Sequence, residues 1–208
     1  MESFSPRVQN KTRAFEVTRA RRNLDIDGAG PELSLRNGYD KNITAFAVSV
    51  NGLIGQIDFV YCDSEGEAGP PIAPGAVSTR GFGNVRRSVN TAAEPEYDIR
   101  VLAVVFDDKT SDGDEKAVAS ILYNRLRTKR LITGILDVLD GDLNSLLTVD
   151  ENVLDELSAR ISHLSSDPAN ASETSDVLLW LHQSDRGLSP RERIIRVKEI
   201  CERLVARL

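Results

Sequence analysis

Short runs of alternating hydrophobic and polar residues dominate the first half of the chain. In residues 32–36, Leu33 and Leu35 alternate with polar neighbours, which predicts a strand with one face in a core and the other in water. Similar β-type runs follow at residues 43–50, 56–61 and 99–106. We therefore predict that strands build the first half of the protein.

Two of these runs carry more specific information. Asn51-Gly52 directly follows the run at 43–50 and tolerates positive φ at both positions, which predicts a tight hairpin turn there. The run at 99–106 is almost wholly apolar and rich in β-branched residues, which predicts a strand covered on both faces in the middle of the structure. Residues 66–75 and 81–83 are rich in glycine and proline and are interpreted as connections or an edge.

The hydrophobic period lengthens near residue 112, from two residues to that of an α-helix. Asp114 can cap a helix running from near Glu115 to near Asp140. Arg125 and Lys129 interrupt the apolar stripe of this helix. The helix therefore either bends there or is not packed against apolar side chains for one turn. Further helices are predicted at residues 151–164, 175–183 and from 190 to the end.

The last of these helices has the strongest capping pattern in the chain. Ser189 can cap it, Pro190 suits its first position, and Glu192 can reach back to the cap. Its apolar side comprises Ile194, Val197, Cys201, Leu204, Val205 and Leu208. We expect Leu204→Ala to cost about 2–5 kcal/mol as a large-to-small change in a core.

These patterns predict the fold class α+β, with an N-terminal immunoglobulin-like β-sandwich followed by a C-terminal helical region of about four helices. A small barrel is the alternative for the β part. Residues 1–14 are expected to form a flexible N-terminus, residues 15–111 the β-sandwich domain, and residues 112–208 the helical region. The pattern leaves open whether the helices form their own bundle or pack on the sheet.

Composition narrows the classes of function. A net charge of -6 argues against a general affinity for phosphate backbones, so no nucleic-acid partner is predicted. The two basic clusters, residues 11–22 and 125–130, have no recognisable DNA-binding motif around them and are interpreted as solvated faces. No apolar run approaches the roughly 20 residues of a spanning helix, so no membrane span is predicted. The first ten residues contain no apolar segment of a secretory signal, which is expected of a cytoplasmic protein and equally of the mature part of an exported one.

The cysteines and histidines do not form a recognisable site in the sequence. Cys62 and Cys201 are too far apart for a metal site or a redox pair, and a long-range disulfide is an alternative to a buried thiol at Cys201. His163 and His182 have no Cys or His at zinc-ligand spacing, and no Gly-x-Ser-x-Gly turn occurs. We predict no catalytic residue and no cofactor from these patterns.

The acidic segment 107–115 is the main candidate for chemistry. The order Asp108, Thr110, Asp112, Gly113 is similar to the start of a calcium loop, which makes the first three residues weak candidate ligands. The twelfth position is Ala119, where such loops need a bidentate Glu. A strand-to-helix connection with a capping Asp explains the same residues without a metal.

The order of several segments resembles that of uncharacterised bacterial exported proteins that carry an immunoglobulin-like β domain. The resemblance is carried by residues 33–37, 42–46, 72–75 and 104–108, the last of which runs into Gly113-Asp114 and a helix, and it covers roughly residues 33–127. It implies an extracytoplasmic setting, periplasmic or secreted, for a chain whose signal segment is absent from this sequence. It implies no catalytic residues.

We therefore expect a non-enzymatic binding or interaction module outside the cytoplasm, with another protein as its partner. The candidate contact regions are residues 66–75 and 79–87, because loops on a rigid sandwich commonly carry contacts. One alternative is a hydrolase with a site at the junction of the two halves near Asp107, Asp108 and Asp112. The other is a structural component of the cell envelope without a specific ligand.

Overall fold

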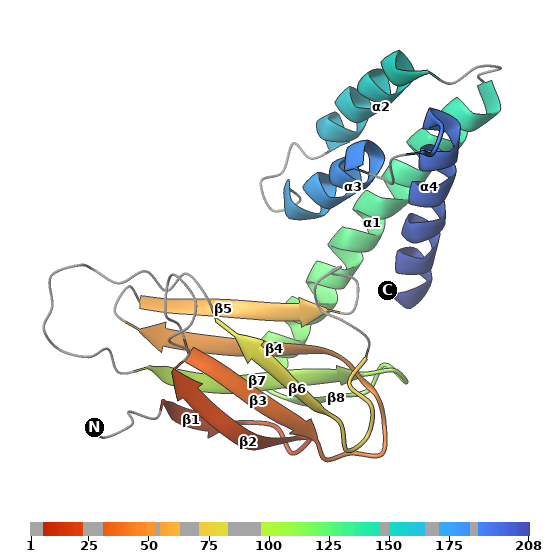
Figure 1. Cartoon of the computed structure of the whole chain (residues 1–208). Helices are drawn as coiled ribbons and strands as arrows, with labels where there is room; N and C mark the ends of the chain where they lie inside the picture. Colours follow the sequence, from red (N-terminus) through yellow and green to blue (C-terminus); the bar gives the residue numbers. More distant parts are fainter. Residues whose placement is uncertain are drawn as a thin grey trace, which may run out of the picture. The chain divides into compact units, whose positions relative to one another are not determined.

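The computed structural model describes residues 6–22, 31–52, 55–62, 71–82, 97–145, 150–164, 171–183 and 187–208. Within these residues the protein is mixed α+β, with eight strands in two sheets followed by four helices (Figure 1). It divides into two compact units, unit 1 with the described residues up to Leu122 and unit 2 with those from Tyr123 onward. The predicted order, strands first and helices second, is confirmed.

Unit 1 contains both sheets. The first sheet consists of β1 (Arg7–Asn10), β4 (Ile43–Gly52), β5 (Gly55–Cys62), β7 (Asp98–Phe106) and β8 (Ser111–Gly113), with the order β1-β7-β4-β5 and β8 paired to β7. The second sheet consists of β2 (Phe15–Arg22), β3 (Pro31–Asn37) and β6 (Val77–Gly81), in the order β2-β3-β6. β1 runs parallel to β7, and the other described strand pairs are antiparallel.

The two sheets form two layers with a shared core between them (Figure 1). Leu33 and Leu35 of β3 are buried in this core, as the alternation in the sequence predicts. Phe15 of β2 meets Phe46 of β4 edge-on across the core, with 5.4 Å between the ring centroids. Ser34, between the two leucines, is also buried, at 7% exposure, and its hydroxyl lies 2.9 Å from that of Thr79, so the polar face of β3 is not in water as the alternation predicts.

β7 is buried at successive positions from Ala103 to Phe106, and a β-bulge changes which of its side chains face the core. Val48 pairs with Val101 while Ala47 pairs with Ala103, so Leu102 is the extra residue. Before the bulge the odd-numbered side chains face the core between the sheets, and after it they face the outer side of the first sheet. This explains the almost wholly apolar run at 99–106 and confirms the predicted central strand.

The opening turns of α1 cover that outer side of the first sheet. A second apolar cluster of unit 1 consists of Ala45, Ala47, Ala103, Val105, Ala117 and Ile121. Four of these residues lie on β4 and β7, and two lie on α1 (Glu115–Ser145). The first two turns of α1 are therefore part of the β unit.

Three predictions about unit 1 are wrong in their boundaries. Residues 7–10 form β1 instead of part of a flexible N-terminus, held by backbone bonds such as Arg7 N to Tyr97 O at 3.0 Å. The hairpin of β4 and β5 exists, but Asn51 and Gly52 still pair with Gln56 and Gly55 and so belong to the strand, and residues 53–54 lie outside the described residues. Residues 79–81 belong to β6, because their backbone pairs with β3.

Unit 2 is helical. It contains the remainder of α1, together with α2 (Glu151–Leu164), α3 (Ala171–Gln183) and α4 (Pro190–Arg207). Its core is made by side chains of all four helices: Leu131, Ile132, Ile135, Leu139, Leu154, Leu157, Ile161, Val177, Leu181, Ile194, Val197 and Cys201. The predicted caps are confirmed, with Asp114 accepting from the N–H groups of Lys116 and Ala117, and with the capping box at Ser189.

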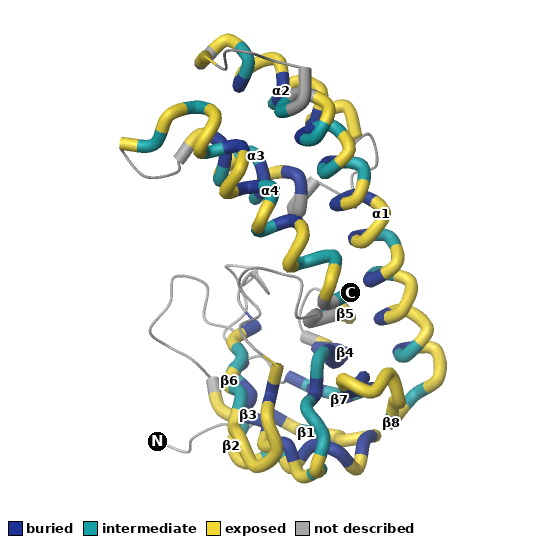
Figure 2. Tube along the Cα trace, turned by 90° about the vertical axis from the view of Figure 1, so that its right-hand side faces the viewer, coloured by how far each residue is buried: buried dark blue, intermediate teal, exposed yellow. Residues whose placement is uncertain are grey.

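α1 is one continuous helix, and its buried side contains polar residues in the middle. In Figure 2 the buried positions of α1 recur along one side of the helix. The stripe comprises Ala117, Ile121, Arg125, Thr128, Ile132, Ile135 and Leu139. Arg125 is part of the buried stripe and is only 9% exposed. At the next turn Thr128 is buried, and Lys129 is exposed. The helix therefore continues through the interruption seen in the sequence.

α4 buries fewer residues than its sequence pattern predicts. Ile194, Val197 and Cys201 are fully buried, but Leu204 and Val205 are only half-buried near the helix end. The predicted cost for Leu204→Ala is therefore too high. Cys201 is a free thiol, so the alternative of a long-range disulfide is wrong, and burial raises its pKa to about 12 with a further contribution from the charge of Glu202. No helix in the described parts of the chain has the length and apolarity to cross a membrane.

Candidate functional site

The acidic segment after β7 is a compact turn in which Asp108 is already engaged. Its carboxylate pairs with Nζ of Lys41 at 2.6 Å and accepts from the backbone N–H and the hydroxyl of Thr110. The hydrogen bond from Lys41, followed by those from Thr110, lowers the pKa of Asp108 to about 2. The same contact with Asp108 raises the pKa of Lys41. This carboxylate stabilises a turn.

Asp107 and Asp112 hold other parts of unit 1. Asp107 accepts from Nδ2 of Asn42 at 2.7 Å, and Asp112 accepts from the backbone N–H groups of Arg13 and Ala14. Among the described residues, no group of three His, Cys, Asp or Glu side chains is arranged to hold a metal ion. None of these three aspartates lines either groove described below. Calcium binding and a hydrolase site at this segment stay predictions, because the contacts of Asp107, Asp108 and Asp112 described above are all with other parts of unit 1.

The structure brings together a serine and a histidine that the sequence did not connect. Oγ of Ser158 on α2 lies 2.8 Å from Nε2 of His182 on α3. The hydroxyl of Ser158 donates to the carbonyl of Leu154, and a hydroxyl has one proton, so His182 is the donor in this pair. A histidine that donates to the hydroxyl cannot deprotonate it at the same time. The pair therefore links α2 to α3, and His163 stays exposed at the end of α2.

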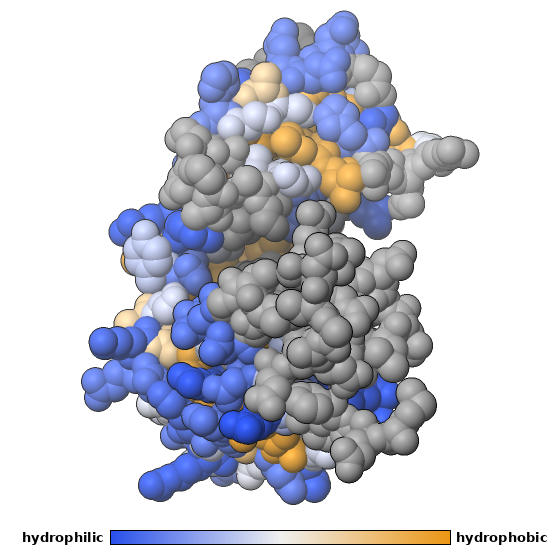
Figure 3. Space-filling view, turned by 90° about the vertical axis from the view of Figure 1, so that its left-hand side faces the viewer, coloured by the Kyte–Doolittle hydropathy of each residue, from blue (hydrophilic) through white to orange (hydrophobic). Residues whose placement is uncertain are grey.

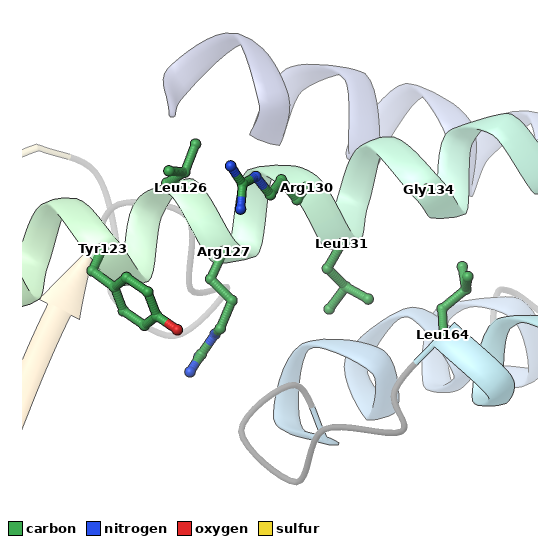
Figure 4. A pocket seen from close by; sticks show the side chains of 7 residues that line it. All are labelled: Tyr123, Leu126, Arg127, Arg130, Leu131, Gly134 and Leu164. Carbon is green, nitrogen blue, oxygen red and sulfur yellow. The ribbon is translucent and has the colours of Figure 1, made fainter.

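The first groove lies on α1 in unit 2 and has a volume of about 310 Å³. It is lined by Tyr123, Leu126, Arg127, Arg130, Leu131 and Gly134 of α1 and by Leu164 of α2, and we call it the helix groove. Figure 4 shows Tyr123, Arg127 and Leu131 pointing to the same side of α1, with Leu164 facing them from α2. The groove thus combines apolar side chains with two guanidinium groups.

Large apolar side chains in the helix groove stay accessible to water. Tyr123 is 66% exposed and Leu126 is 48% exposed, whereas Leu131 is part of the unit 2 core. A Cβ atom on Gly134 would lie 3.7 Å from Cδ1 of Leu164, so α2 comes close to α1 at this glycine. Figure 3 shows apolar surface among hydrophilic side chains on the helical unit. The helix groove is therefore an amphipathic surface that ends where α2 begins to cover α1.

The second groove lies in unit 1, between the outer side of the first sheet and the start of α1, and has a volume of about 300 Å³. We call it the sheet groove. Its polar lining residues are Lys11, Ser49, Gln56, Asp58, Arg100, Asp114, Lys116 and Ser120, and its apolar ones are Ala47, Phe59, Leu102 and Ala117. Asp58, Ser49 and Arg100 lie directly opposite one another on β5, β4 and β7, so they form one row across the sheet.

The charges of the sheet groove largely neutralise one another. Arg100 places both Nε and Nη2 within 3.2 Å of one carboxylate oxygen of Asp98. Asp58 accepts from the amide of Gln56 at 3.0 Å. Asp114 caps α1 and also meets Lys11 at 3.5 Å, and these contacts, led by the backbone N–H of Ala117, lower the pKa of Asp114. The groove is therefore polar without a strong net charge.

Neither groove was predicted from the sequence. Residues 125–130 were interpreted as a solvated basic face, and the structure places Leu126, Arg127 and Arg130 of that segment in the helix groove. The sheet groove draws on positions about 50 residues apart, which become neighbours only through strand pairing. The one available signal was Ser49, a polar residue between the buried Val48 and Val50. Of the predicted contact regions, residues 66–70 and 83–87 lie outside the described residues.

Comparison of the chain with protein-family models, with curated proteins and with solved structures finds no match. The functional proposals that follow therefore rest on the residues of this chain and, for the cellular setting, on the resemblance of residues 33–127 described above.

Proposed function

We propose that the chain is a non-enzymatic binding module that receives an acidic, amphipathic helical segment of another protein in the helix groove. The observation that carries this proposal is the exposure of Tyr123 and Leu126 beside Arg127 and Arg130. An exposed apolar surface rimmed by polar residues is typical of a protein-binding site. Tyrosine and arginine are also the residue types that contribute most to binding energy at interfaces.

Charge favours an acidic partner. The chain has a net charge of -6, yet the helix groove contains two arginines and no carboxylate in its lining. Arg130 forms no ion pair with any side chain that the structure describes. A carboxylate of the partner would gain a charge-assisted hydrogen bond there, and the complementary charge would also speed the encounter.

Position on the fold favours a helical partner segment. α2 comes close to α1 at Gly134, and Tyr123, Arg127 and Leu131 of the helix groove point to the side of α1 on which Leu164 lies (Figure 4). A partner helix lying on α1 in this groove would add a packing contact of the kind that already builds unit 2. Such a helix would present apolar residues at positions i, i+3 or i+4 to Tyr123 and Leu126, with Asp or Glu directed at the arginines.

The immunoglobulin-like nature of unit 1 is part of the proposal. With β2, β3 and β6 taken as strands A, B and E, and β4, β7 and β8 as C, F and G, the neighbour orders A-B-E and C-F-G agree with that fold. β5 then occupies the place of the additional strand that variable-type domains pair with C. Tyr97 is buried directly before β7, two residues ahead of Ile99, where such sandwiches carry a corner tyrosine.

The extracytoplasmic setting rests on the resemblance of residues 33–127 to exported bacterial proteins. It supports a binding module that meets its partner outside the cell or in the periplasm. A structural envelope component differs from this proposal because it would have no selective ligand in the helix groove.

A peptide-display selection on the full chain tests the function. The probe is a library of displayed peptides about 16 residues long, or roughly 24 Å as a helix. We expect the selection to enrich a family with acidic residues and spaced apolar residues. Tyr123→Ser and Arg130→Glu should each weaken binding of an enriched peptide by at least about tenfold, as is typical of central interface residues.

Arg191→Glu is the matched control, because Arg191 is an exposed arginine of α4 outside the helix groove and the charge change is the same. It should leave binding of the enriched peptide unchanged. Thermal unfolding of each variant verifies that the fold is intact. A selection without an enriched family, or a family whose binding Tyr123→Ser and Arg130→Glu leave unchanged, overturns the proposal.

A further inference from the structure

The floor of the sheet groove contains a serine hydroxyl group to which the described residues give no hydrogen-bond partner. Ser49 is only 3% exposed as a residue, and its hydroxyl forms no hydrogen bond with any group that the structure describes. Val48 and Val50, its neighbours along β4, point into the core between the sheets, so Ser49 points to the opposite side, where it lines the groove. The oxygen of Ser49 is not among the buried side-chain atoms without a partner, so it is open to the groove and can form a hydrogen bond with a ligand there.

We infer that the sheet groove binds a neutral, hydroxyl-rich small molecule of the size of a mono- or disaccharide. The inference is independent of the helix groove and concerns unit 1 alone. It follows from the row of Asp58, Ser49 and Arg100, which offers an acceptor, a hydroxyl that can donate and accept, and a donor. Each hydroxyl group of a sugar also donates one hydrogen bond and accepts others, so it can match all three positions.

The spacing of the row suits a sugar ring. Adjacent strands lie about 4.8 Å apart, so the row extends over roughly 10 Å between its outer backbone positions. The side chains of Asp58 and Arg100 can reach inward from the two ends, while Ser49 forms the floor between them. A volume of about 300 Å³ lies at the small end of the usual range for ligand sites, which favours one or two sugar rings over a longer chain.

The distribution of charge favours a neutral ligand. An anion would approach Asp58 and Asp114, and a cation would approach Lys11, Lys116 and Arg100. Both kinds of ion would therefore meet like charges in the same groove, which is unfavourable at this range. A sugar avoids this cost and can place its C–H face on the apolar part of the lining, which includes Leu102 and Ala117.

Titration of the isotope-labelled full chain with sugars, followed by amide chemical shifts, tests the inference. The probes are glucose, galactose, mannose, N-acetylglucosamine and their disaccharides, with inorganic phosphate and glycine betaine as an anion and a zwitterion. We expect at least one sugar to shift the amide signals of Ser49, Asp58, Arg100 and Ser120 in a saturable way. The amide signals of α4, in unit 2, should not move with them.

Variants connect the binding to the row. Ser49→Ala removes the hydroxyl alone and should weaken binding of that sugar by at least about fivefold, the loss of one hydrogen bond. Ser78→Ala, a strand serine of the second sheet, is the matched control and should have no effect. Asp58→Asn supplies a second test at an exposed position, where the fold does not depend on the side chain, and should also weaken binding.

Each remaining outcome overturns the inference. It fails if no sugar produces saturable shifts, or if phosphate or glycine betaine shifts the same signals in preference to every sugar. It also fails if the sugar binds the Ser49→Ala and Asp58→Asn variants as it binds the natural protein.

Discussion

Gly113 lies so close to Leu102 that a Cβ atom on Gly113 would fall 2.2 Å from the carbonyl oxygen of Leu102. The bulge residue of β7 thus meets a strand residue that must lack a side chain. The φ of Gly113 is also 113°, a value that other residues rarely adopt. Gly113→Ala should therefore lower the free energy of unfolding of unit 1 by about 2–4 kcal/mol, measured by urea titration followed by circular dichroism.

Gly141→Ala is the matched control for this change. Gly141 lies within α1, and a Cβ there would meet nothing within 4 Å. Alanine in a helix interior is favoured over glycine, so this variant should be neutral or more stable by up to about 1 kcal/mol. Equal losses in both variants would mean that the contact with Leu102 is not the cause.

Asp112 connects β8 to the segment between β1 and β2. Its carboxylate accepts from the N–H groups of Arg13 and Ala14, and Ala14 is fully buried. Asp112→Ala should cost about 1–3 kcal/mol of unfolding free energy, because it leaves these donors unpaired. Asp112→Asn keeps an acceptor oxygen and should cost clearly less in the same urea titration. A similar loss in both would show that charge, and not hydrogen bonding, is responsible.

The pKa of Asp108 gives unit 1 a specific dependence on acid. Its pKa is lowered from 3.8 to about 2 by Lys41 and Thr110, so its contribution to stability is complete above about pH 4 and is lost as the pH falls toward 2. A side-chain NMR titration should show this low pKa in the natural protein. In Lys41→Met the pKa of Asp108 should rise toward its ordinary value, and the stability lost between about pH 4 and pH 2 should become smaller. An unchanged pKa in that variant would contradict the assignment of Lys41 as the main cause.

Two residues of α4 should differ in their contribution to unit 2. Ile194 is fully buried in the core, whereas Leu204 is half-buried near the helix end. Ile194→Ala should cost about 2–5 kcal/mol, and Leu204→Ala less than half as much. Denaturant titration followed by the fluorescence of Trp180, which packs against the same core, measures both. A larger loss for Leu204→Ala would place the end of α4 inside the core.

The sequence carried enough information for the elements whose signals are local. The caps at Asp114 and Ser189 begin α1 and α4 as predicted, because a capping side chain bonds to backbone groups within three residues. The alternation of Leu33 and Leu35 predicted their burial for the same reason. In each case one short segment contains both the residue and what it contacts.

Features that depend on distant partners could not be predicted. β1 has mostly exposed side chains and is held by backbone hydrogen bonds, which every residue type except proline can make, so no pattern distinguishes it. The bulge at Leu102 changes the core-facing positions of β7 from odd to even numbers, so the sequence shows no regular alternation there. The sheet groove needs Ser49, Asp58 and Arg100 on neighbouring strands, and the sequence does not specify that register. The predicted carboxylates at 108 and 112 have different partners in the fold.

The first turns of α1 determine where a fragment of unit 1 can end. Ala117 and Ile121 seal the outer side of the first sheet, against Ala45, Ala47, Ala103 and Val105. A truncation between β8 and α1 would remove Ala117 and Ile121 and expose the small apolar side chains of β4 and β7 to water. A fragment that contains the two sheets must therefore include about the first two turns of α1 to keep this cluster buried.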